Sequence, residues 1–250
     1  ANILAYDKVR YHGHPIAAVA ATSNSIAEEA LKLIKVEYEP LPVILDVMEA
    51  VKADSPLIDE NLRTNDDPSL PASNIAKTNI FKSGNIEKGF EEADVVLEKE
   101  FDSGTVHQGY IEPHACVARF TEGGEILLWV SSQGHFSLRD QSAQLLGLEP
   151  SQIKAIAAEI GGGFGGKTTI YVEPVAALLS KKSGAPVKIT MTRAEVLEAS
   201  GPTSGSYMKV KMGADKNGKI VAADATLKFE AGAWAGSPVG AAAMCIFTPY

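Results

Sequence analysis

The sequence predicts a mixed fold of helices and strands, of the α+β class. Residues 1–60 alternate between short apolar runs and segments with helical spacing. Residues 54–79 are rich in Asp, Asn, Ser and Pro and show little periodicity, which is typical of a linker. From Ile80 onward strand patterns dominate, interrupted by two helical patterns. We therefore expect two domains, over residues 1–60 and 80–250, joined by a linker over residues 61–79.

The first domain is expected to begin with a strand followed by a helix. Residues 16–22 form a continuous run of small apolar side chains, which predicts a buried strand. Ser25, with an acidic residue three positions later, has capping-box spacing, so a helix is expected over residues 25–34. Residues 36–38 predict a short strand that leads into a Pro-rich turn, and residues 43–51 predict a further helix.

The second domain is expected to contain more strands than helices. The predicted strands cover residues 94–101, 106–120, 125–130, 152–160, 186–192, 207–212 and 219–229. The predicted helices cover residues 136–146 and 170–182. Each helix is followed by a glycine, Gly147 or Gly184, which is the residue favoured just past a helix C-terminus. Residues 215–218, with the sequence DKNG, predict a hairpin turn between the last two strands.

Composition and charge exclude several classes of protein. The 250 residues are 45% apolar and 22% charged, as in an ordinary globular protein, and no apolar run has the roughly 18 residues of a membrane span. The net charge of −8 argues against nucleic-acid binding, which requires a basic surface. Two cysteines, Cys116 and Cys245, are too few for a disulfide framework or for an iron–sulfur cluster held by this chain alone. We expect a cytoplasmic protein with no membrane span and no nucleic-acid partner.

The sharpest motif is the glycine-rich stretch IGGGFGGKT between a predicted strand and a predicted helix. Glycine permits positive φ and close approach of the main chain to a ligand, so backbone amides there can face an anion. Residues 161–168 also satisfy the P-loop pattern G-x-x-x-x-G-K-T, in which Lys167 and Thr168 would contact phosphate and magnesium. An aromatic Phe164 in mid-loop and the lack of a strand ending in a magnesium-binding Asp weaken that pattern. A simple connector is the third interpretation.

Two further polar segments are candidates for chemistry. Gln133 follows a predicted strand in the segment WVSSQGH, which makes it a candidate for a directed hydrogen bond. His107, Glu112 and His114 are residue types that bind metals. On a strand, however, the odd separation of the two histidines would place them on opposite faces. Ordinary hydrogen-bonded side chains are therefore favoured, and no metal ligand is assigned.

Taken in order, these segments resemble the large, molybdopterin-binding subunit of the xanthine dehydrogenase/aldehyde oxidase family. The segment VRYHGHPIAAVAATSNSIAEEALKLIKVEYEPLP resembles the later part of the α/β hammerhead domain of that family. HQGYIEPHACVARF, WVSSQGHF, EIGGGFGGK and EPVAALLSKKSGAPVKITMTRAEVL follow in the order of the family. The resemblance extends over nearly the whole chain and outweighs the P-loop pattern. It implies a partial hammerhead domain followed by the first part of a molybdopterin-binding domain.

The resemblance implies a molybdopterin-dependent oxidoreductase. Such an enzyme inserts a water-derived oxygen into a C–H bond of an aldehyde or an N-heteroaromatic substrate and passes electrons through 2Fe-2S clusters to FAD. The cofactor would be molybdenum-molybdopterin, expected in the cytosine dinucleotide form. By position, Gln133 would donate to a molybdenum oxo ligand, and the backbone of Gly162, Gly163, Phe164 and Gly165 would approach the metal and the pterin dithiolene. Gln133 and Phe164 are thus the candidate catalytic residues.

The chain departs from the family pattern in two ways. Purine-hydroxylating members carry Glu directly after GGGFGGK, whereas this chain has Thr168, a substrate-proximal residue that argues against a purine. The substrate-side Arg loop and the catalytic-base Glu of the family would lie beyond Tyr250. We therefore expect a fragment or one part of a split subunit, inactive alone. The expected partners are the remaining C-terminal molybdopterin-binding segment, an iron–sulfur subunit and a FAD subunit. A P-loop nucleotide-binding protein and a non-catalytic scaffold remnant of the family are the alternatives.

Overall fold

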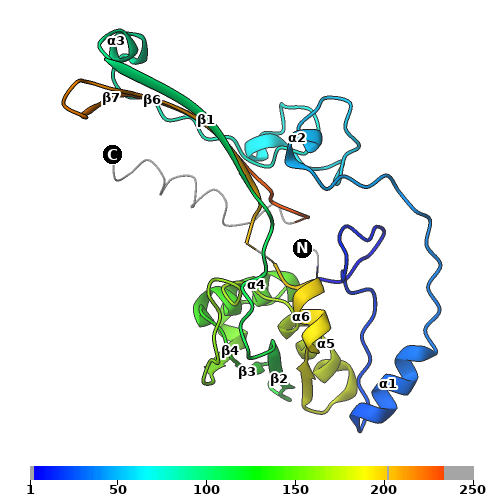
Figure 1. The fold of residues 1–250 in the computed structure, drawn as a ribbon. Coiled ribbons are helices and arrows are strands. Elements are labelled where there is room, and N and C mark those ends of the chain that lie inside the picture. The colour runs from blue at the N-terminus through cyan, green and yellow to red at the C-terminus, as the bar shows by residue number, and fades with distance from the viewer. Residues whose placement is uncertain (1–2, 202, 234–250) are drawn as a thin grey trace. The chain divides into compact units, whose positions relative to one another are not determined.

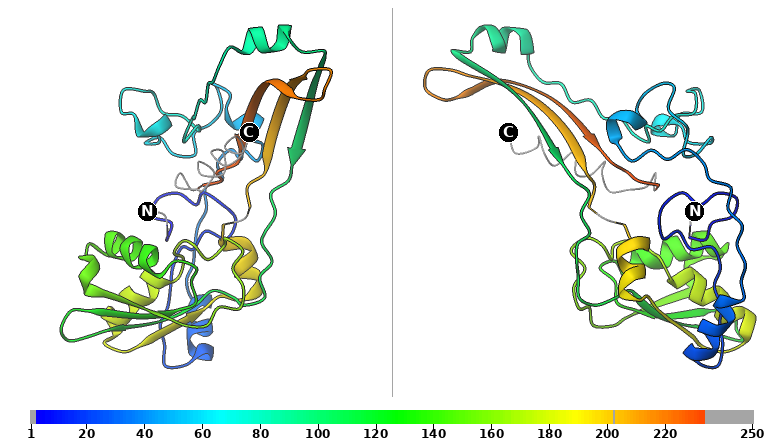
Figure 2. Two further views of the ribbon diagram at one scale, coloured as in Figure 1. Left: turned by 90° about the vertical axis from the view of Figure 1, so that its left-hand side faces the viewer. Right: turned by 45° about the vertical axis from the view of Figure 1, so that its right-hand side comes forward.

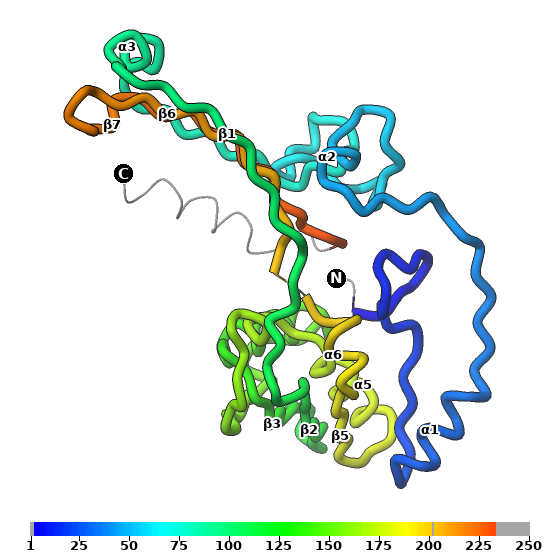
Figure 3. Tube along the Cα trace, viewed as in Figure 1, coloured from blue at the N-terminus to red at the C-terminus, as the bar shows by residue number. Residues whose placement is uncertain are grey.

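The computed structural model describes residues 3–201 and 203–233 and confirms the mixture of helices and strands (Figure 1). The chain divides into two compact units, each built from two separate stretches. The first unit comprises Ala1–Glu39 and His107–Thr203, and the second comprises Pro40–Val106 and Ser204–Tyr250. The path of the chain through the units can be followed in Figure 3. The predicted domain boundaries at residues 60 and 80 stay a prediction.

The first unit contains a four-stranded sheet in the order β4-β3-β2-β5. Its strands are β2 (Ala115–Phe120), β3 (Ile126–Val130), β4 (Ile153–Ala157) and β5 (Val187–Thr190). β2 runs antiparallel to β3 and β5, whereas β3 and β4 run parallel and are joined through helix α4 (His135–Leu146). Because β3 and β4 are parallel and Val130 is paired with Ala157, the segments that follow both strands leave the same edge of the sheet.

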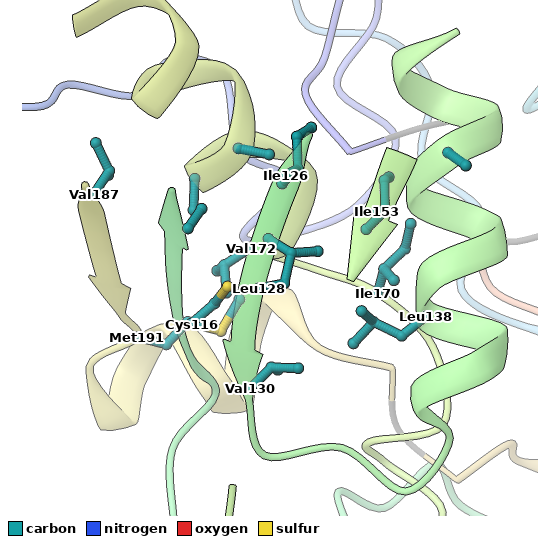
Figure 4. Packing of buried hydrophobic residues seen from close by; sticks show 14 of the residues in the cluster. Cys116, Ile126, Leu128, Val130, Leu138, Ile153, Ile170, Val172, Val187 and Met191 are labelled. Atoms are coloured by element: carbon teal, nitrogen blue, oxygen red, sulfur yellow. The ribbon is translucent and has the colours of Figure 1, made fainter. Parts of the chain in front are cut away.

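Helices α4 and α5 (Glu173–Ser183) close the core of this unit. α5 packs on β2 and β3, and both helices end at a glycine in the left-handed conformation, Gly147 with φ 65° and Gly184 with φ 67°, as predicted. A third helix, α6 (Arg193–Ala199), begins with a capping box between Thr192 and Glu195. Figure 4 shows the apolar side chains that fill the core, among them Cys116, Ile126, Leu128, Val130, Leu138, Ile153, Ile170 and Val172.

The second unit is built on a three-stranded antiparallel sheet in the order β1-β6-β7 (Figure 2). The strands are β1 (Val95–Ser103), β6 (Ser206–Ala214) and β7 (Ile220–Phe229). The predicted turn over residues 215–218 is confirmed, because the Asp215 N–H donates to the Lys219 carbonyl and the Gly218 N–H donates to the Asp215 carbonyl. The unit also contains the short helices α2 (Val47–Ala50), α3 (Ile86–Glu91) and η1 (Thr64–Asp66).

Several predictions for the N-terminal segment were wrong. Residues 16–22 and 36–38 lie outside any strand and are at most partly buried. A strand exists only where a second strand completes its hydrogen bonds, and an apolar run does not reveal whether such a partner is present. The predicted helix over residues 25–34 is confirmed as α1 (Asn24–Lys32), but Ser23, not Ser25, accepts the capping N–H.

Three further boundaries differ from the prediction. The strand expected over residues 106–120 begins only at Ala115, because Gly109 has a φ of 67° and Pro113 has no N–H to donate. The helix expected over residues 43–51 is reduced to α2, since Asp46 Oδ1 accepts from the first helical amides. α5 starts three residues later than expected, at Glu173. No helix in the described part of the chain has the length and apolarity to cross a lipid bilayer.

Candidate functional site

The glycine loop, defined here as residues 161–166, follows β4 at the edge of the sheet. Gly162, Phe164 and Gly165 adopt positive φ values of 100°, 49° and 89°. The left-handed conformation costs a residue with a Cβ about 1–2 kcal/mol, so at Phe164 it requires support from the surrounding structure. The Phe164 side chain is 76% exposed, so burial of the ring does not provide that support. The loop is instead held by hydrogen bonds on two sides.

Gln133 holds the C-terminal end of the glycine loop. Its Oε1 accepts from the Gly165 N–H over 3.0 Å and from the Lys167 N–H over 3.1 Å. Its own N–H donates to the Lys167 carbonyl over 2.9 Å. Because two N–H donors face one end of the side-chain amide, that end must be the oxygen. The Nε2 donor is therefore left to bind something else, since it donates to no described residue.

Glu112 and Lys167 hold the other side of the loop. Glu112 Oε2 accepts from the Gly161 N–H over 2.7 Å and from the Lys167 ammonium over 2.5 Å. The Lys167 side chain is only 1% exposed, and its Nζ lies 5.1 Å from the centre of the Tyr110 ring. Burial alone would raise the pKa of the Glu112 carboxyl, but Lys167 and the Gly161 N–H more than offset this and hold that pKa below its ordinary value.

The loop presents hydrogen-bond donors that no described residue accepts. The amides of Gly162, Gly163 and Phe164 have no acceptor among residues 3–201 and 203–233, and Gln133 Nε2 adds a fourth donor. A cluster of backbone amides in a loop with positive φ values can bind an anion. Gly163 cannot be replaced without rearrangement, because a Cβ there would overlap the side chain of Gln133. The site can therefore stabilise negative charge on a bound group.

These features fit an anionic group such as a molybdopterin cofactor, which the loop amides and Gln133 Nε2 would hold. The described residues contain no group of three or more His, Cys, Asp or Glu side chains that could hold a metal ion. Gln108 Oε1 is buried without a hydrogen-bond partner and lies next to Gly166, at the same loop. A buried polar atom of this kind is rare in a native structure unless a ligand, ion or water satisfies it. Sequence reasoning did not single out Gln108, whose buried oxygen lies beside the loop.

His107 and His114 belong to a buried hydrogen-bonded network beneath the loop. The Tyr110 hydroxyl is joined to His114 Nε2 over 2.6 Å and to the Ser200 hydroxyl over 3.1 Å. His107 Nε2 is joined to the same Ser200 hydroxyl over 2.9 Å. Burial, with the charge of Lys167 nearby, lowers the pKa of His114 to about 4. The interpretation as hydrogen-bonded side chains is confirmed. The segment is not a strand, so the two histidines do not lie on opposite faces of a sheet.

The structure contradicts the P-loop alternative. In a P-loop the Lys presents its ammonium to phosphate and is followed directly by a helix. Here the Lys167 ammonium is buried against Glu112, and α5 begins only at Glu173. The Thr168 hydroxyl donates to the Gly165 carbonyl over 2.9 Å, within the loop itself.

The structure brings the predicted site residues together around the glycine loop. Gln133, Gly163 and Gly165 are in direct contact, and Thr168 contacts Gly165. Sequence reasoning weighed Glu112 only as a metal ligand and missed its ion pair with Lys167. No local pattern signals that pair, because the two residues are distant in sequence.

The fold and site agree with family models for molybdopterin binding. Residues 68–250 match the molybdopterin cofactor-binding domain, and residues 1–42 match the a/b hammerhead domain of aldehyde oxidase and xanthine dehydrogenase. The chain belongs to the xanthine dehydrogenase/aldehyde oxidase family and corresponds to part of its molybdopterin-binding subunit.

Curated relatives and solved structures agree with this assignment. The chain is 35% identical to a probable xanthine dehydrogenase subunit of Bacillus subtilis. The match covers 93% of this chain and 30% of that protein. It is 32% identical to the nicotinate dehydrogenase large molybdopterin subunit of Eubacterium barkeri, over 92% of this chain and 51% of that subunit.

The crystal structure of a Cu,Mo-CO dehydrogenase matches 90% of this chain and 29% of its own chain, with a TM-score of 0.77 and 31% identity. The aldehyde oxidoreductase of Desulfovibrio gigas matches 83% of this chain and 22% of its own with a TM-score of 0.70 and 26% identity. The chain thus spans between about a third and a half of the curated relatives named here.

Proposed function

We propose that this chain contributes the glycine loop and Gln133 to the molybdenum site of a hydroxylase that oxidises a C–H bond of an aldehyde or N-heteroaromatic substrate with water-derived oxygen. The cofactor is molybdenum-molybdopterin in its cytosine dinucleotide form, and it supplies the two-electron redox chemistry when bound. Electrons leave through 2Fe-2S clusters to FAD on partner chains or segments. The remaining molybdopterin-binding segment completes the site, and the chain alone is inactive. The assembly is cytoplasmic.

One observation carries this proposal: the glycine loop has amides that donate to no described residue, and it lies against a side-chain amide of fixed orientation. Gln133 Oε1 is occupied by Gly165 and Lys167, so Nε2 is the end available to a ligand. The amides of Gly162, Gly163 and Phe164 provide backbone donors in the same loop. Preorganised donors of this kind stabilise negative charge, because they need no reorganisation during the reaction. The chain therefore binds and orients an anionic cofactor.

Phe164 and Thr168 are the residues that influence which substrate the site accepts. The exposed Phe164 ring offers an apolar face beside the loop, suited to a flat or apolar substrate. The Thr168 hydroxyl is neutral and already donates to Gly165, so it cannot replace the carboxylate with which purine-oxidising members contact their substrate. The relatives include proteins named for nicotinate and for aldehydes, and these are the substrate classes to test first.

The test is the molybdenum content of the purified assembly that contains this chain, together with the nucleotide released by acid. About one molybdenum per chain together with CMP is the expected result. Absence of molybdenum from the complete assembly would overturn the proposal and favour a non-catalytic scaffold. Molybdenum without CMP would leave the hydroxylase in place and overturn only the cytosine dinucleotide form.

A further inference from the structure

The two ends of the glycine loop meet at a single carboxylate oxygen. Glu112 Oε2 accepts from the Gly161 N–H at the start of the loop over 2.7 Å, and from the Lys167 ammonium directly after the loop over 2.5 Å. The Glu112 N–H also donates to the Gly161 carbonyl over 3.3 Å. Because Gly161 has no Cβ, the Glu112 side chain packs directly against its backbone; a Cβ there would lie 2.8 Å from that of Glu112.

The charge of Lys167 makes this contact obligatory. The Lys167 side chain is buried, and Glu112 is the acidic residue with which it forms an ion pair. A buried ammonium is strongly unfavourable without a partner, so the loop cannot move away from Glu112 without exposing Lys167 or leaving its charge uncompensated. The Tyr110 ring, which lies against Gly166 and beneath the ammonium, fills the remaining space.

Lys167 also connects this ion pair to the candidate catalytic amide. Its side chain binds Glu112, whereas its main-chain N–H and carbonyl both bind Gln133. If Lys167 moves, its main-chain carbonyl and N–H, which orient Gln133, therefore move with it. The direction of Gln133 Nε2 depends in this way on a carboxylate that Gln133 does not touch.

We propose that Glu112 and Lys167 are positioning residues, which close the glycine loop and thereby fix the orientation of Gln133 toward the molybdenum cofactor. This inference rests on the proposed function. It assigns no contact with substrate or cofactor to either residue. In the positioning role, the ion pair sets the geometry of the site. In the alternative, structural role, it only neutralises a buried charge.

Two variants of the full assembly separate these roles. The double variant Glu112→Gln with Lys167→Met removes both charges together, so no unpaired charge is buried, but it breaks the link between the two loop ends. The second variant, Glu112→Asp, keeps the negative charge beside Lys167 but withdraws the carboxylate by one methylene. Glu98→Gln is the matched control. It removes the carboxylate of an exposed ion pair between Glu98 on β1 and Lys209 on β6, outside the loop.

The readouts are the melting temperature, the molybdenum content and the Mo(V) electron paramagnetic resonance spectrum after partial reduction with sodium dithionite. We expect the double variant to melt close to the wild type and yet to give a shifted Mo(V) spectrum or at least a threefold lower molybdenum content. Glu112→Asp should show the same change, and Glu98→Gln should match the wild type.

The outcomes are distinct for the two proposals. A wild-type Mo(V) spectrum and molybdenum content in either folded variant, Glu112→Asp or the double variant, would show that the pair is merely structural and overturn this inference alone. A wild-type assembly without molybdenum would instead overturn the proposed function, and this inference with it.

Discussion

Gln133 and Lys167 are joined by two hydrogen bonds of opposite direction. The Gln133 N–H donates to the Lys167 carbonyl over 2.9 Å, and the Lys167 N–H donates to Gln133 Oε1 over 3.1 Å. The Gly165 N–H donates to the same oxygen. The side-chain amide of Gln133 is therefore fixed by the loop at its oxygen end, which leaves the opposite, nitrogen end available to a ligand.

Substitutions of Gln133 should separate the effect of its oxygen end from the effect of its nitrogen end. Gln133→Glu keeps oxygen acceptors for both loop amides but has no donor, so we expect unfolding stability within about 1 kcal/mol of the wild type. Turnover of the complete enzyme should fall roughly 100-fold, as for the loss of one preorganised donor. Gln133→Ala should in addition lower the free energy of unfolding by about 1–3 kcal/mol, because it removes the two hydrogen bonds that the side-chain oxygen accepts. Calorimetry and steady-state turnover measure both effects. Undiminished turnover in Gln133→Glu would make Gln133 a structural residue.

Gly163→Ala should displace Gln133 without unfolding the protein. The added Cβ would overlap the amide end of the Gln133 side chain, and the φ of Gly163 is not positive, so backbone strain is absent. We expect a loss of stability below about 2 kcal/mol and a large loss of molybdenum or turnover.

Gly124→Ala is the control for this variant. Gly124 lies between β2 and β3 with a φ of 84°, and a Cβ there would meet nothing within 4 Å. The substitution should cost about 1–2 kcal/mol through backbone strain alone and leave the molybdenum content unchanged. A molybdenum content and a turnover in Gly163→Ala that both equal those of the wild type would contradict the displacement of Gln133 by the added Cβ.

Local signals predicted those parts of the fold that depend on neighbours in sequence. The helix ends at Gly147 and Gly184 and the hairpin turn at residues 215–218 are confirmed, because each requires a particular backbone conformation that nearby residues encode. Residues 16–22 were predicted as a strand on equally good local evidence. They form none, because pairing depends on a partner elsewhere in the chain.

The candidate site was only partly predictable for the same reason. The glycine loop and Gln133 were found through resemblance and motif order, and the structure places them in contact. The ion pair between Glu112 and Lys167 could not be inferred, because nothing local connects two residues that the sheet brings together. The orphaned oxygen of Gln108 likewise depends on packing around Tyr110 and Gly166, which no sequence pattern describes.

The thiol of Cys116 should be unreactive in the folded protein. The side chain is buried on β2, and burial raises the pKa of the thiol well above its ordinary value, so the nucleophilic thiolate is scarce. We expect iodoacetamide at pH 8 to label Cys116 only after denaturation, as followed by mass spectrometry of its peptide. Chain unfolded in guanidinium is the positive control. Rapid labelling of the native protein would show that β2 opens readily.

The stability of the first unit should decrease as the pH is lowered, because of His114. The folded-state pKa of His114 is about 4, against an ordinary value of about 6.5, because the ring is buried with the Lys167 charge nearby. As the pH falls below 6.5 the unfolded chain takes up a proton that the native state does not bind. The contribution of His114 is therefore complete above pH 6.5 and is lost between pH 6.5 and 4, up to about 3 kcal/mol.

The difference between the wild type and His114→Gln isolates this effect from the other titrating groups. Between pH 7 and pH 5 we expect the wild type to lose about 2 kcal/mol more of its unfolding free energy than the variant. His12→Gln is the control, because His12 is an exposed histidine. Denaturant unfolding at the two pH values measures the difference. Identical pH dependence in the wild type and His114→Gln would mean that the pKa of His114 is the same in the native and unfolded states, so that burial does not shift it.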